Sequence, residues 1–548
     1  MGDVQDTTHQ TGQNGQSATD TVPVDAVVVG AGFAGMYMLH KLKELGFSAR
    51  VFERGSDVGG TWYWNRYPGA RCDVQSLQYS YQFSEDLQQE WNWSEKYSSQ
   101  AEILRYAKHV ADRFHLRDHI QFNTQVESAV FDEAEGRWTI TTDIEDRVSS
   151  TFCIMATGCL SSKKTPDFQG LNDFQGEWYH TSNWPHAGVD FTGKRVGVIG
   201  TGSTGIQAIP EIAKQAKHLS VFQRTAQYSV PARNAPMDPE EEARIKADYQ
   251  GFRARNNTQS FGQDLNQDRA TGKTFEASDA ERQREYETCW EKGGLTPLVA
   301  YEDSTTNLEA NETLSNFLRE KIQTIVKDPE VAQVLSPKHV YACKRPCMDG
   351  GYFETFNRSN VTLVDCSTAG TNITRQGIDV SGTEYALDCI VFATGFDAMT
   401  GALNSIDIRG KNKQTLKDKW AEGPRSYLGL SSAGFPNFFT ITGPGSPSVL
   451  ANMIPAIEQH VNWIGECLEY MRTRSLTTIE ATTEVEDEWV SHVTQLAGTT
   501  LWTACDNWYQ GANIPGKPRV FMPYVDWPGY VDKCKEIVKN SYEGFALG

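Results

Sequence analysis

The 548-residue chain carries 51 basic and 70 acidic side chains, so its formal net charge is −19. This acidic balance argues against nucleic acid or an anionic membrane as the main partner, because both require a basic surface. The 11 cysteines are odd in number and include no C-x-x-C pair, which predicts reduced thiols, with neither a disulfide framework nor a metal site.

The first 20 residues lack the apolar core of a signal peptide and are expected to form a disordered tail. The longest apolar run, 26–39, is too short and too rich in glycine to cross a bilayer. We therefore expect a soluble, cytoplasmic protein with no membrane partner.

A dinucleotide-binding unit is predicted directly after this tail. An apolar strand at 24–29 leads into G-A-G-F-A-G at 30–35, then a helical pattern and a second strand, 49–52, that ends at Glu53. Glycines at this turn let a pyrophosphate approach the backbone, and the helix N-terminus offers it free N–H groups. Glu53 is placed to accept hydrogen bonds from ribose hydroxyls. An acid at this position suits FAD.

An aromatic loop follows, reading G-G-T-W-Y-W-N-R-Y-P-G-A-R-C-D at 59–73. Its density of Trp, Tyr, Gly and Pro indicates a loop packed on a flat ligand, for which an isoalloxazine ring is a natural candidate. An aromatic core loop without a ligand is the alternative.

A linker at 174–185 reads F-Q-G-E-W-Y-H-T-S-N-W-P and separates the two glycine motifs of the chain. Glycine breaks its periodicity and proline extends its end, so we expect irregular structure that joins two domains. Packing of its aromatic residues against a domain face is the simpler interpretation.

A second glycine motif, G-T-G-S-T-G at 200–205, lies between a strand at 195–199 and a helix, and the next strand ends near Phe222. The acid is missing here, and the chain instead has Arg224. A guanidinium can bind a 2′-phosphate that a carboxylate would repel, so this unit suits NADPH. A solvated surface arginine is the alternative.

Two longer patterns resemble the fingerprints of type I Baeyer–Villiger monooxygenases, a family that includes phenylacetone, steroid and cyclohexanone monooxygenases. The linker matches F-x-G-x-x-x-H-x-x-x-W-P through Phe174, Gly176, His180, Trp184 and Pro185. The aromatic loop matches G-G-x-W-x-x-x-x-Y-P-G-x-x-x-D at every fixed position. The resemblance runs from about residue 24 to the end of the chain.

The resemblance implies an α/β fold with two Rossmann-like dinucleotide-binding domains, for FAD and NADP, and a helical insertion. The A-T-G segments at 156–158 and 393–395 mark passages between the domains. The FAD domain would comprise 21–160 and 397–548, and the NADP domain 161–230 and 341–396. The insertion, 231–340, has a polar helical pattern without β-rich runs, and a disordered part near 256–272 is left open.

The implied reaction is the FAD- and NADPH-dependent insertion of one oxygen atom of O₂ next to a ketone carbonyl. It gives an ester or lactone by way of a C4a-peroxyflavin and a tetrahedral (Criegee) intermediate. Arg345, in K-R-P at 344–346, would be the catalytic arginine because it stays cationic beside developing negative charge. Asp73 would hold Arg345, and Lys344 would complete the catalytic set. A small hydrophobic ketone is the implied substrate, and no obligate protein partner is evident.

The resemblance also implies the remaining site residues. Those that bind the cofactors are Gly30, Gly32, Phe33, Gly35, Glu53, Gly60, Thr61, Trp62, Trp64, Asp73, Tyr79, Val126, Gly200, Thr201, Gly202, Ser203, Thr204, Gly205, Arg224, Thr225, Lys344 and Trp508. Those that line the substrate pocket are Ser448, Val449, Leu450 and Met453. His180 is expected to act as a hinge residue in a conformational step, with general base as its alternative role.

Three other functions are compatible with parts of the sequence. A heteroatom-oxidising flavin monooxygenase shares both glycine motifs. A pyridine nucleotide–disulfide reductase would need a redox cysteine pair, and none has C-x-x-C spacing. A non-catalytic nucleotide-binding redox sensor would not need Arg345, Asp73 and Lys344.

Overall fold

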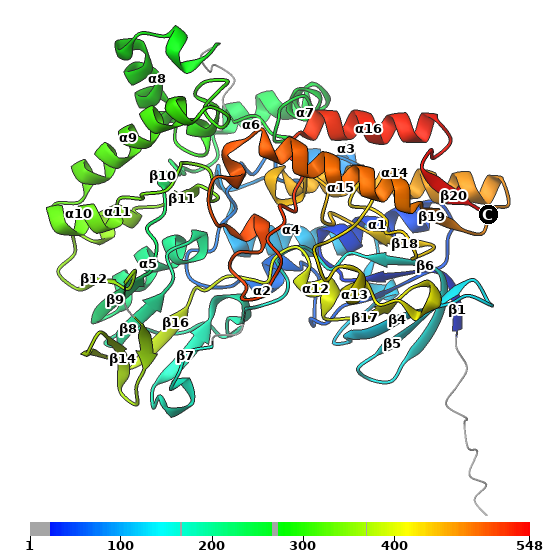
Figure 1. Ribbon diagram of the computed structural model, residues 1–548, viewed down its shortest axis with the longest axis horizontal. Helices are drawn as coiled ribbons and strands as arrows, with labels where there is room; N and C mark the ends of the chain where they lie inside the picture. The colour runs from blue at the N-terminus through cyan, green and yellow to red at the C-terminus, as the bar shows by residue number, and fades with distance from the viewer. Residues whose placement is uncertain (1–21, 165–166, 266–271, 369) are drawn as a thin grey trace, which may run out of the picture.

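A computed structural model describes residues 22–164, 167–265, 272–368 and 370–548 (Figure 1). The tail predicted at 1–20 lies outside these residues. The chain forms two main sheets, at the lower left and lower right of Figure 1, with helices above them. Among the described residues, no helix is long and apolar enough to span a membrane.

The first sheet has eight strands and is mostly parallel. Its order is β17 (Asp407–Arg409), β4 (Val126–Asp132), β5 (Arg137–Thr142), β6 (Arg147–Met155), β1 (Val22–Val29), β2 (Ala49–Phe52) and β3 (Ile120–Gln121), with β18 (Phe438–Thr440) also paired to β6. Antiparallel pairing is confined to β4–β5 and β5–β6. The carboxyl half of β6 pairs on one side with β1 and on the other with β18.

Both faces of this sheet are buried, which explains the unbroken apolar run of β1. Val28 packs in the cluster that includes helices α1 (Phe33–Glu44) and α14 (Met453–Thr473). Its neighbours Val27 and Val29 pack on the opposite face with the indole of Trp138.

The second sheet has five parallel strands. Its order is β12 (Val361–Asp365), β9 (His218–Gln223), β8 (Arg195–Ile199), β16 (Cys389–Phe392) and β7 (Glu177–His180). Helix α5 (Ser203–Gln215) covers one face, where Val196 and Val198 are fully buried. The antiparallel strands β13 (Thr371–Ile373), β14 (Gly377–Val380) and β15 (Thr383–Ala386) cover the other. The predicted α/β class with two Rossmann-like units is confirmed.

Strand β7 corrects one prediction, because the linker at 174–185 is not irregular throughout. Glu177–His180 pairs in parallel with β16 at the sheet edge, and a 3₁₀ turn follows at Thr181–Asn183. The strand has no apolar alternation because it is an edge strand, and Trp178 remains 45% exposed. Backbone pairing with β16, which the sequence does not reveal, makes it a strand.

A helical unit is inserted between β10 (Ser229–Pro231) and β11 (Cys347–Asp349), which pair in parallel at its base. It contains α6 (Pro239–Lys246), α7 (Tyr249–Asn257), α8 (Asp279–Lys292), α9 (Leu308–Ile325) and α10 (Pro329–Leu335). A capping box between Ser278 and Glu281 begins α8. Part of the segment left open as disordered is ordered in α7, whereas 266–271 lie outside the described residues. The boundaries of the domains stay a prediction.

Shorter elements complete the chain. They are α2 (Thr61–Trp64), α3 (Glu85–Glu90), α4 (Gln100–Arg113), α11 (Tyr352–Thr355), α12 (Gly401–Asn404), α13 (Leu416–Lys419), α15 (Thr483–Gly498), α16 (Trp527–Lys539), and the pair β19 (Ile479–Ala481) with β20 (Phe545–Leu547).

The cysteines depart from the sequence prediction. Cys343 and Cys505 form a disulfide whose Cα atoms are 5.7 Å apart, and the other nine cysteines are buried and lie outside any disulfide of the described residues. The expectation of reduced thiols throughout is therefore wrong for this pair. The two residues are 162 positions apart, so local spacing could not indicate that they meet.

Candidate active site

A cavity of about 1270 Å³ extends between the two glycine motifs. It is lined from both main sheets and by the aromatic loop, the Lys344–Arg345 segment and a C-terminal loop. Because a single cavity reaches both motifs, two dinucleotides bound at them would meet inside it.

The first glycine motif forms a tight strand-to-helix turn. Gly30 has φ +104°, and a Cβ there would lie 2.6 Å from the carbonyl oxygen of Ala156. A Cβ on Gly35 would lie 1.8 Å from the carbonyl oxygen of Gly30, so α1 packs directly on the turn. Gly35 does not line the cavity and acts through packing. Both glycines are therefore required by the geometry of the cradle.

Glu53 closes this cradle from the end of β2. Its carboxylate accepts hydrogen bonds from the backbone N–H groups of Ala31 at 2.7 Å and Gly55 at 2.6 Å. Burial raises the pKa of Glu53, against the lowering effect of these bonds. The side chain still lines the cavity, so it can meet a ribose while it holds the turn. The residues present fit FAD.

The second glycine motif repeats this geometry. Gly200 has φ +109°, and a Cβ on Gly205 would lie 2.1 Å from the carbonyl oxygen of Gly200. The hydroxyl of Thr201 donates to the carbonyl of Thr225 at 3.0 Å, which ties the turn to the end of β9. Gly205, like Gly35, lies behind the cavity wall.

Three cations gather beside this second turn: Arg224, Lys344 and Lys164. Burial, and then the charge of Arg224, lower the pKa of both lysines. Like charges brought together in this way favour an anionic ligand between them. Lys164 was not predicted as a site residue. Its only sequence signal is its position shortly after the A-T-G segment that follows β6. The donor set fits the phosphate of NADP.

The aromatic loop presents flat faces to the cavity. The indole N–H of Trp62 donates to the hydroxyl of Tyr79 at 3.0 Å, and the two rings meet edge to face. The guanidinium of Arg54 lies 4.6 Å from the ring centroid of Trp64. Gly60, Thr61 and Val126, which were also predicted, line the cavity as well.

Arg345 and Asp73 form an ion pair at the cavity wall. The Nε and Nη2 atoms of Arg345 donate to Oδ2 of Asp73 at 3.0 and 2.6 Å, and Nη1 donates to the carbonyl of Val449 at 2.8 Å. Burial opposes the charge of Arg345, but Asp73 and the neighbouring hydroxyl of Tyr509 outweigh it and raise its pKa. Arg345 is therefore a permanent cation in a fixed orientation.

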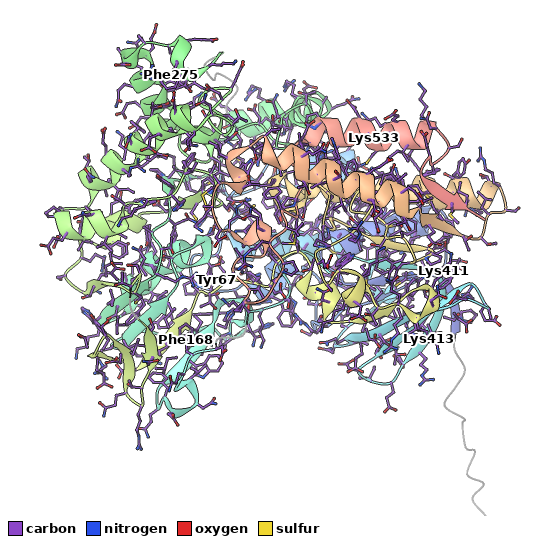
Figure 2. All side chains as sticks on the ribbon, viewed as in Figure 1. Tyr67, Phe168, Phe275, Lys411, Lys413 and Lys533 are labelled. Atoms are coloured by element: carbon purple, nitrogen blue, oxygen red, sulfur yellow. A yellow bond between two sulfur atoms is a disulfide. The ribbon has the colours of Figure 1, made fainter. Side chains whose placement is uncertain are left out.

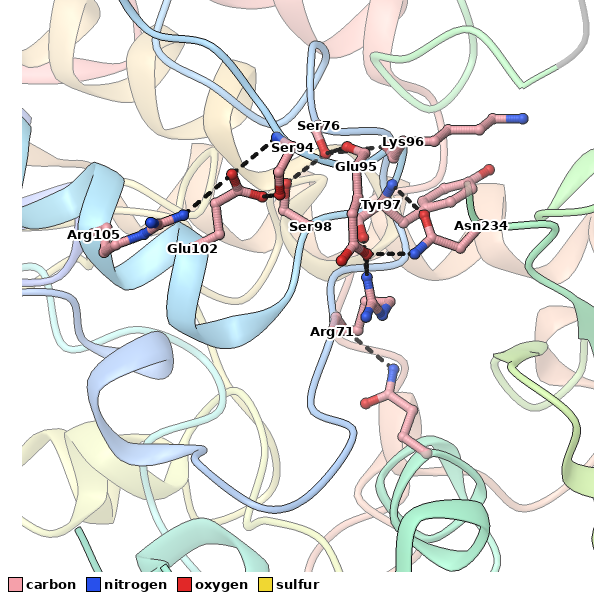
Figure 3. Close-up of polar contacts among 11 residues, drawn as sticks. Arg71, Ser76, Ser94, Glu95, Lys96, Tyr97, Ser98, Glu102, Arg105 and Asn234 are labelled. Carbon is pink, nitrogen blue, oxygen red and sulfur yellow. Dashed lines mark hydrogen bonds and ion pairs between the residues drawn. The ribbon is translucent and has the colours of Figure 1, made fainter. Parts of the chain in front are cut away.

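A polar network fixes the segment that carries Asp73 (Figure 3). Arg71 donates to the carboxylate of Glu95, which also accepts from the amide of Asn234 at 2.5 Å. The carbonyl of Arg71 accepts from the amide of Gln207 on α5 at 3.1 Å. The network thus joins the aromatic loop to the second sheet and to the start of the helical insertion.

His180 lies behind the cavity wall and not on it. It is 5% exposed; Nδ1 lies 2.7 Å from the hydroxyl of Ser182 and Nε2 lies 3.1 Å from the hydroxyl of Thr394. Burial, and then the charge of Lys163, lower its pKa to about 4. A neutral, enclosed imidazole that joins β7 to the end of β16 is poorly placed to remove a proton from a substrate.

Two of the four predicted pocket residues reach the cavity. Val449 and Met453 line it, whereas Ser448 and Leu450 are buried and do not. Trp508 also lines it, from a 3₁₀ turn at Trp508–Gln510. The remaining predicted residues that line the cavity are Gly32, Phe33, Gly202, Ser203 and Thr204. Tyr67, in the aromatic loop, and Phe168, which was not predicted, also line it. Figure 2 labels both on the side of the second sheet, where Phe168 packs on Phe392 of β16.

Known proteins resemble this chain along nearly its whole length. Residues 24–234 match the family model described as flavin-binding monooxygenase-like. The chain is 42% identical to a Baeyer-Villiger monooxygenase of Pseudooceanicola batsensis, with 95% of each protein covered. It is 41% identical to a phenazine N-monooxygenase of Lysobacter antibioticus, with 96% of this chain and 98% of that protein covered. Its structure matches that of an oxidized steroid monooxygenase bound to NADP with a TM-score of 0.92 and 49% identity, over 96% of this chain and 99% of that one.

Proposed function

This chain belongs to the Baeyer–Villiger monooxygenases, which use FAD and NADPH, and from that premise we propose that it oxygenates a small hydrophobic ketone. The product is the ester or lactone in which one oxygen atom of O₂ lies next to the former carbonyl carbon. The supporting observation is the Arg345–Asp73 ion pair, which lies in the wall of the cavity that extends to both glycine motifs.

The protein residues hold charge and exclude water. Bound FAD, reduced by NADPH, supplies the activated oxygen. Arg345 stabilises the negative charge that develops on the oxygen nucleophile and then on the ketone oxygen, and its cationic state does not change with pH in the working range. Asp73 orients the guanidinium, which would otherwise be a costly unpaired charge. Lys344 lies beside Arg224, where it can hold the cofactor phosphate.

The proposed substrate follows from the apolar part of the cavity wall that includes Val449, whose carbonyl accepts from Arg345. Val449, Ala451, Met453 and Ile457 supply apolar side chains there, and Leu160 joins them from the end of the first sheet. A ketone with a hydrophobic body would bury its apolar surface against them while its carbonyl meets the cation. We further propose that the enzyme works in the cytoplasm and needs no protein partner.

A turnover experiment tests the proposal. The purified protein receives NADPH, labelled O₂ and a mixture of phenylacetone, cyclohexanone, a long-chain ketone, a steroid ketone and a thioether. Mass spectrometry should find esters or lactones that carry one labelled oxygen. NADPH consumption that yields only peroxide would exclude every ketone in the mixture as the substrate.

N-oxygenation is the second candidate function, because the phenazine N-monooxygenase shares 41% identity across nearly the whole chain. An aromatic nitrogen heterocycle such as a phenazine, added to the same mixture, separates the two. A labelled N-oxide or sulfoxide without any labelled ester would favour heteroatom oxidation.

Replacing Arg224 with alanine should raise the KM for NADPH by about 10- to 100-fold, because a charge-assisted contact to the 2′-phosphate is lost. The KM for NADH should stay within about twofold, since that cofactor lacks the phosphate. Arg195→Ala, at an exposed ion pair with Asp388, is the matched control. An equal rise in the KM for NADPH and for NADH would show that Arg224 does not bind the 2′-phosphate.

Replacing His180 with alanine should increase the peroxide formed per NADPH consumed, because β7 is then less firmly tied to the end of β16. A pH profile of kcat/KM distinguishes this hinge role from general base catalysis. With a pKa of about 4, His180 is neutral throughout the range from pH 6 to pH 9, so the profile should keep its shape in the variant. Loss of an acidic limb in the variant would instead identify His180 as a base.

A further inference from the structure

The C-terminal loop 504–523 forms a wall of the cavity with little regular structure. The 3₁₀ turn at Trp508–Gln510 is its one helical element, and the loop contains no strand. Asp506, Asn507, Trp508, Ala512, Asn513 and Pro515 line the cavity from it. In Figure 1 it is the orange-red segment between the two sheets. Tyr509, Phe521 and Met522 anchor the loop in the core, and the stretch between Tyr509 and Phe521 is held by individual contacts.

Most of these contacts are single hydrogen bonds to the rim of the second sheet. Lys164 donates to the carbonyl of Asn513 at 2.8 Å, and the amide of Asn513 donates to the carbonyl of Phe396 at 2.7 Å. Lys517 pairs with Asp397 at 2.5 Å. Each such contact contributes about 1 kcal/mol or less, because water competes for the same groups.

The disulfide adds a covalent contact at the catalytic end of the loop. Cys343 directly precedes Lys344 and Arg345, and Cys505 directly precedes the residues of the loop that line the cavity. Around the disulfide, Lys344 donates to the carbonyl of Asp506, and the amide of Asn507 donates to the carbonyl of Cys343 at 2.8 Å. The bond thus joins the phosphate-binding lysine to the wall that carries Trp508.

The two ends of the disulfide differ in how firmly they are held without it. On the Cys343 side, the side-chain amide of Asn311 on α9 accepts a hydrogen bond from the N–H of Tyr341 and donates one to its carbonyl, both at 3.0 Å. Two residues further on, Arg345 is bound to Asp73. On the Cys505 side, Asn507 and Tyr509 are buried, whereas Ala504 and Asp506 are exposed and Cys505 is partly exposed. Breaking the bond would therefore loosen the stretch around Cys505 and leave the arginine in place.

We propose that the Cys343–Cys505 disulfide is a redox-sensitive clamp that holds the C-terminal loop over the NADP site. The inference rests on the proposed function, because it assumes that this end of the cavity binds the nicotinamide cofactor. With the disulfide intact, the loop loses little conformational freedom when the cofactor binds. With the disulfide reduced, the cofactor must order a mobile wall, and its affinity falls.

The chemistry of opening is thiol–disulfide exchange with an external dithiol. Cys505 is partly exposed and Cys343 is buried, so the attacking thiolate reaches Sγ of Cys505 and displaces the thiolate of Cys343. The second thiol of the reagent then breaks the mixed disulfide. The protein gains two electrons and two protons as two thiols, and the reagent becomes a disulfide.

Binding of NADP⁺ to the FAD-loaded protein, measured by calorimetry, tests the clamp. Oxidised wild type should bind NADP⁺ about tenfold more tightly than wild type reduced with dithiothreitol, which corresponds to ordering one or two side chains. Cys505→Ser should bind as weakly as reduced wild type and should not respond to dithiothreitol. Cys534→Ser, which removes a free thiol on α16, should respond as wild type does.

Two further readouts separate the clamp from a purely structural bond. Amide hydrogen exchange should increase at 504–515 on reduction and stay unchanged at 341–346. A lower Tm with unchanged NADP⁺ affinity would overturn the clamp, as would peptide mapping that finds both thiols free in the oxidised protein. Failure of oxidised wild type to bind NADP⁺ at all would instead reject the proposed function.

Discussion

Arg345→Ala should lower ester formation at least about 100-fold while NADPH still reduces the bound FAD. Hydride transfer to the flavin needs the two cofactors in contact, whereas the oxygenation steps need a cation beside the developing negative charge. Loss of one preorganised donor of this kind costs about 3 kcal/mol or more of barrier. Lysine at this position should not restore full activity, because its single nitrogen cannot replace the three nitrogens with which Arg345 binds Asp73 and the carbonyl of Val449.

Two assays on the same preparation separate the steps. Rapid mixing with NADPH under anaerobic conditions measures flavin reduction, and chromatography of the organic extract measures ester. Arg409→Ala, which removes an exposed arginine paired with Asp407, is the control and should behave as wild type. A normal ester yield from Arg345→Ala would refute the role proposed for this residue.

Gly35→Ala should yield a protein that has lost most of its FAD. The added methyl would lie 1.8 Å from the carbonyl oxygen of Gly30, so α1 must move away from the turn that holds the pyrophosphate. Displacements of this kind cost about 1–3 kcal/mol in a packed core, which corresponds to a roughly 10- to 100-fold loss in flavin affinity. The FAD released per chain after denaturation measures the effect directly.

Gly498→Ala provides the matched control for that substitution. Gly498 ends α15, and a Cβ there would meet nothing within 4 Å, so full flavin content and an unchanged or slightly higher Tm are expected. If Gly35→Ala retained stoichiometric FAD, the first glycine motif would not be the flavin cradle.

The sequence predicted those parts of the fold that depend on local pattern. Strands β2 and β8 begin and end at the residues that the sequence predicts, 49–52 and 195–199. The glycine motifs were recognisable because tight turns restrict which residues fit. Arg345 and Asp73 were paired by family resemblance, and the hydrogen bonds between them agree with that pairing.

Features that depend on distant contacts were not predictable. β7 is a strand only because β16 offers it backbone partners. The disulfide joins residues from two segments that share no motif. Lys164 reaches the cation group because its backbone N–H donates to the carbonyl of Gly395, just after β16, and the end of β16 lies next to the second glycine turn. Nothing in the local sequence indicates this contact. Ser448 was assigned to the substrate pocket by family resemblance, yet its side chain is buried behind the wall.

The late pairing of β18 with β6 also affects how the chain is made. Phe438 aligns with Cys153, so the ribosome must add roughly 300 residues before that flank of β6 is covered. At typical translation rates this takes about 15–60 s. During that interval the apolar end of β6 is an open sheet edge on a nascent chain. Extra chaperone capacity should therefore raise the soluble yield more than added flavin does.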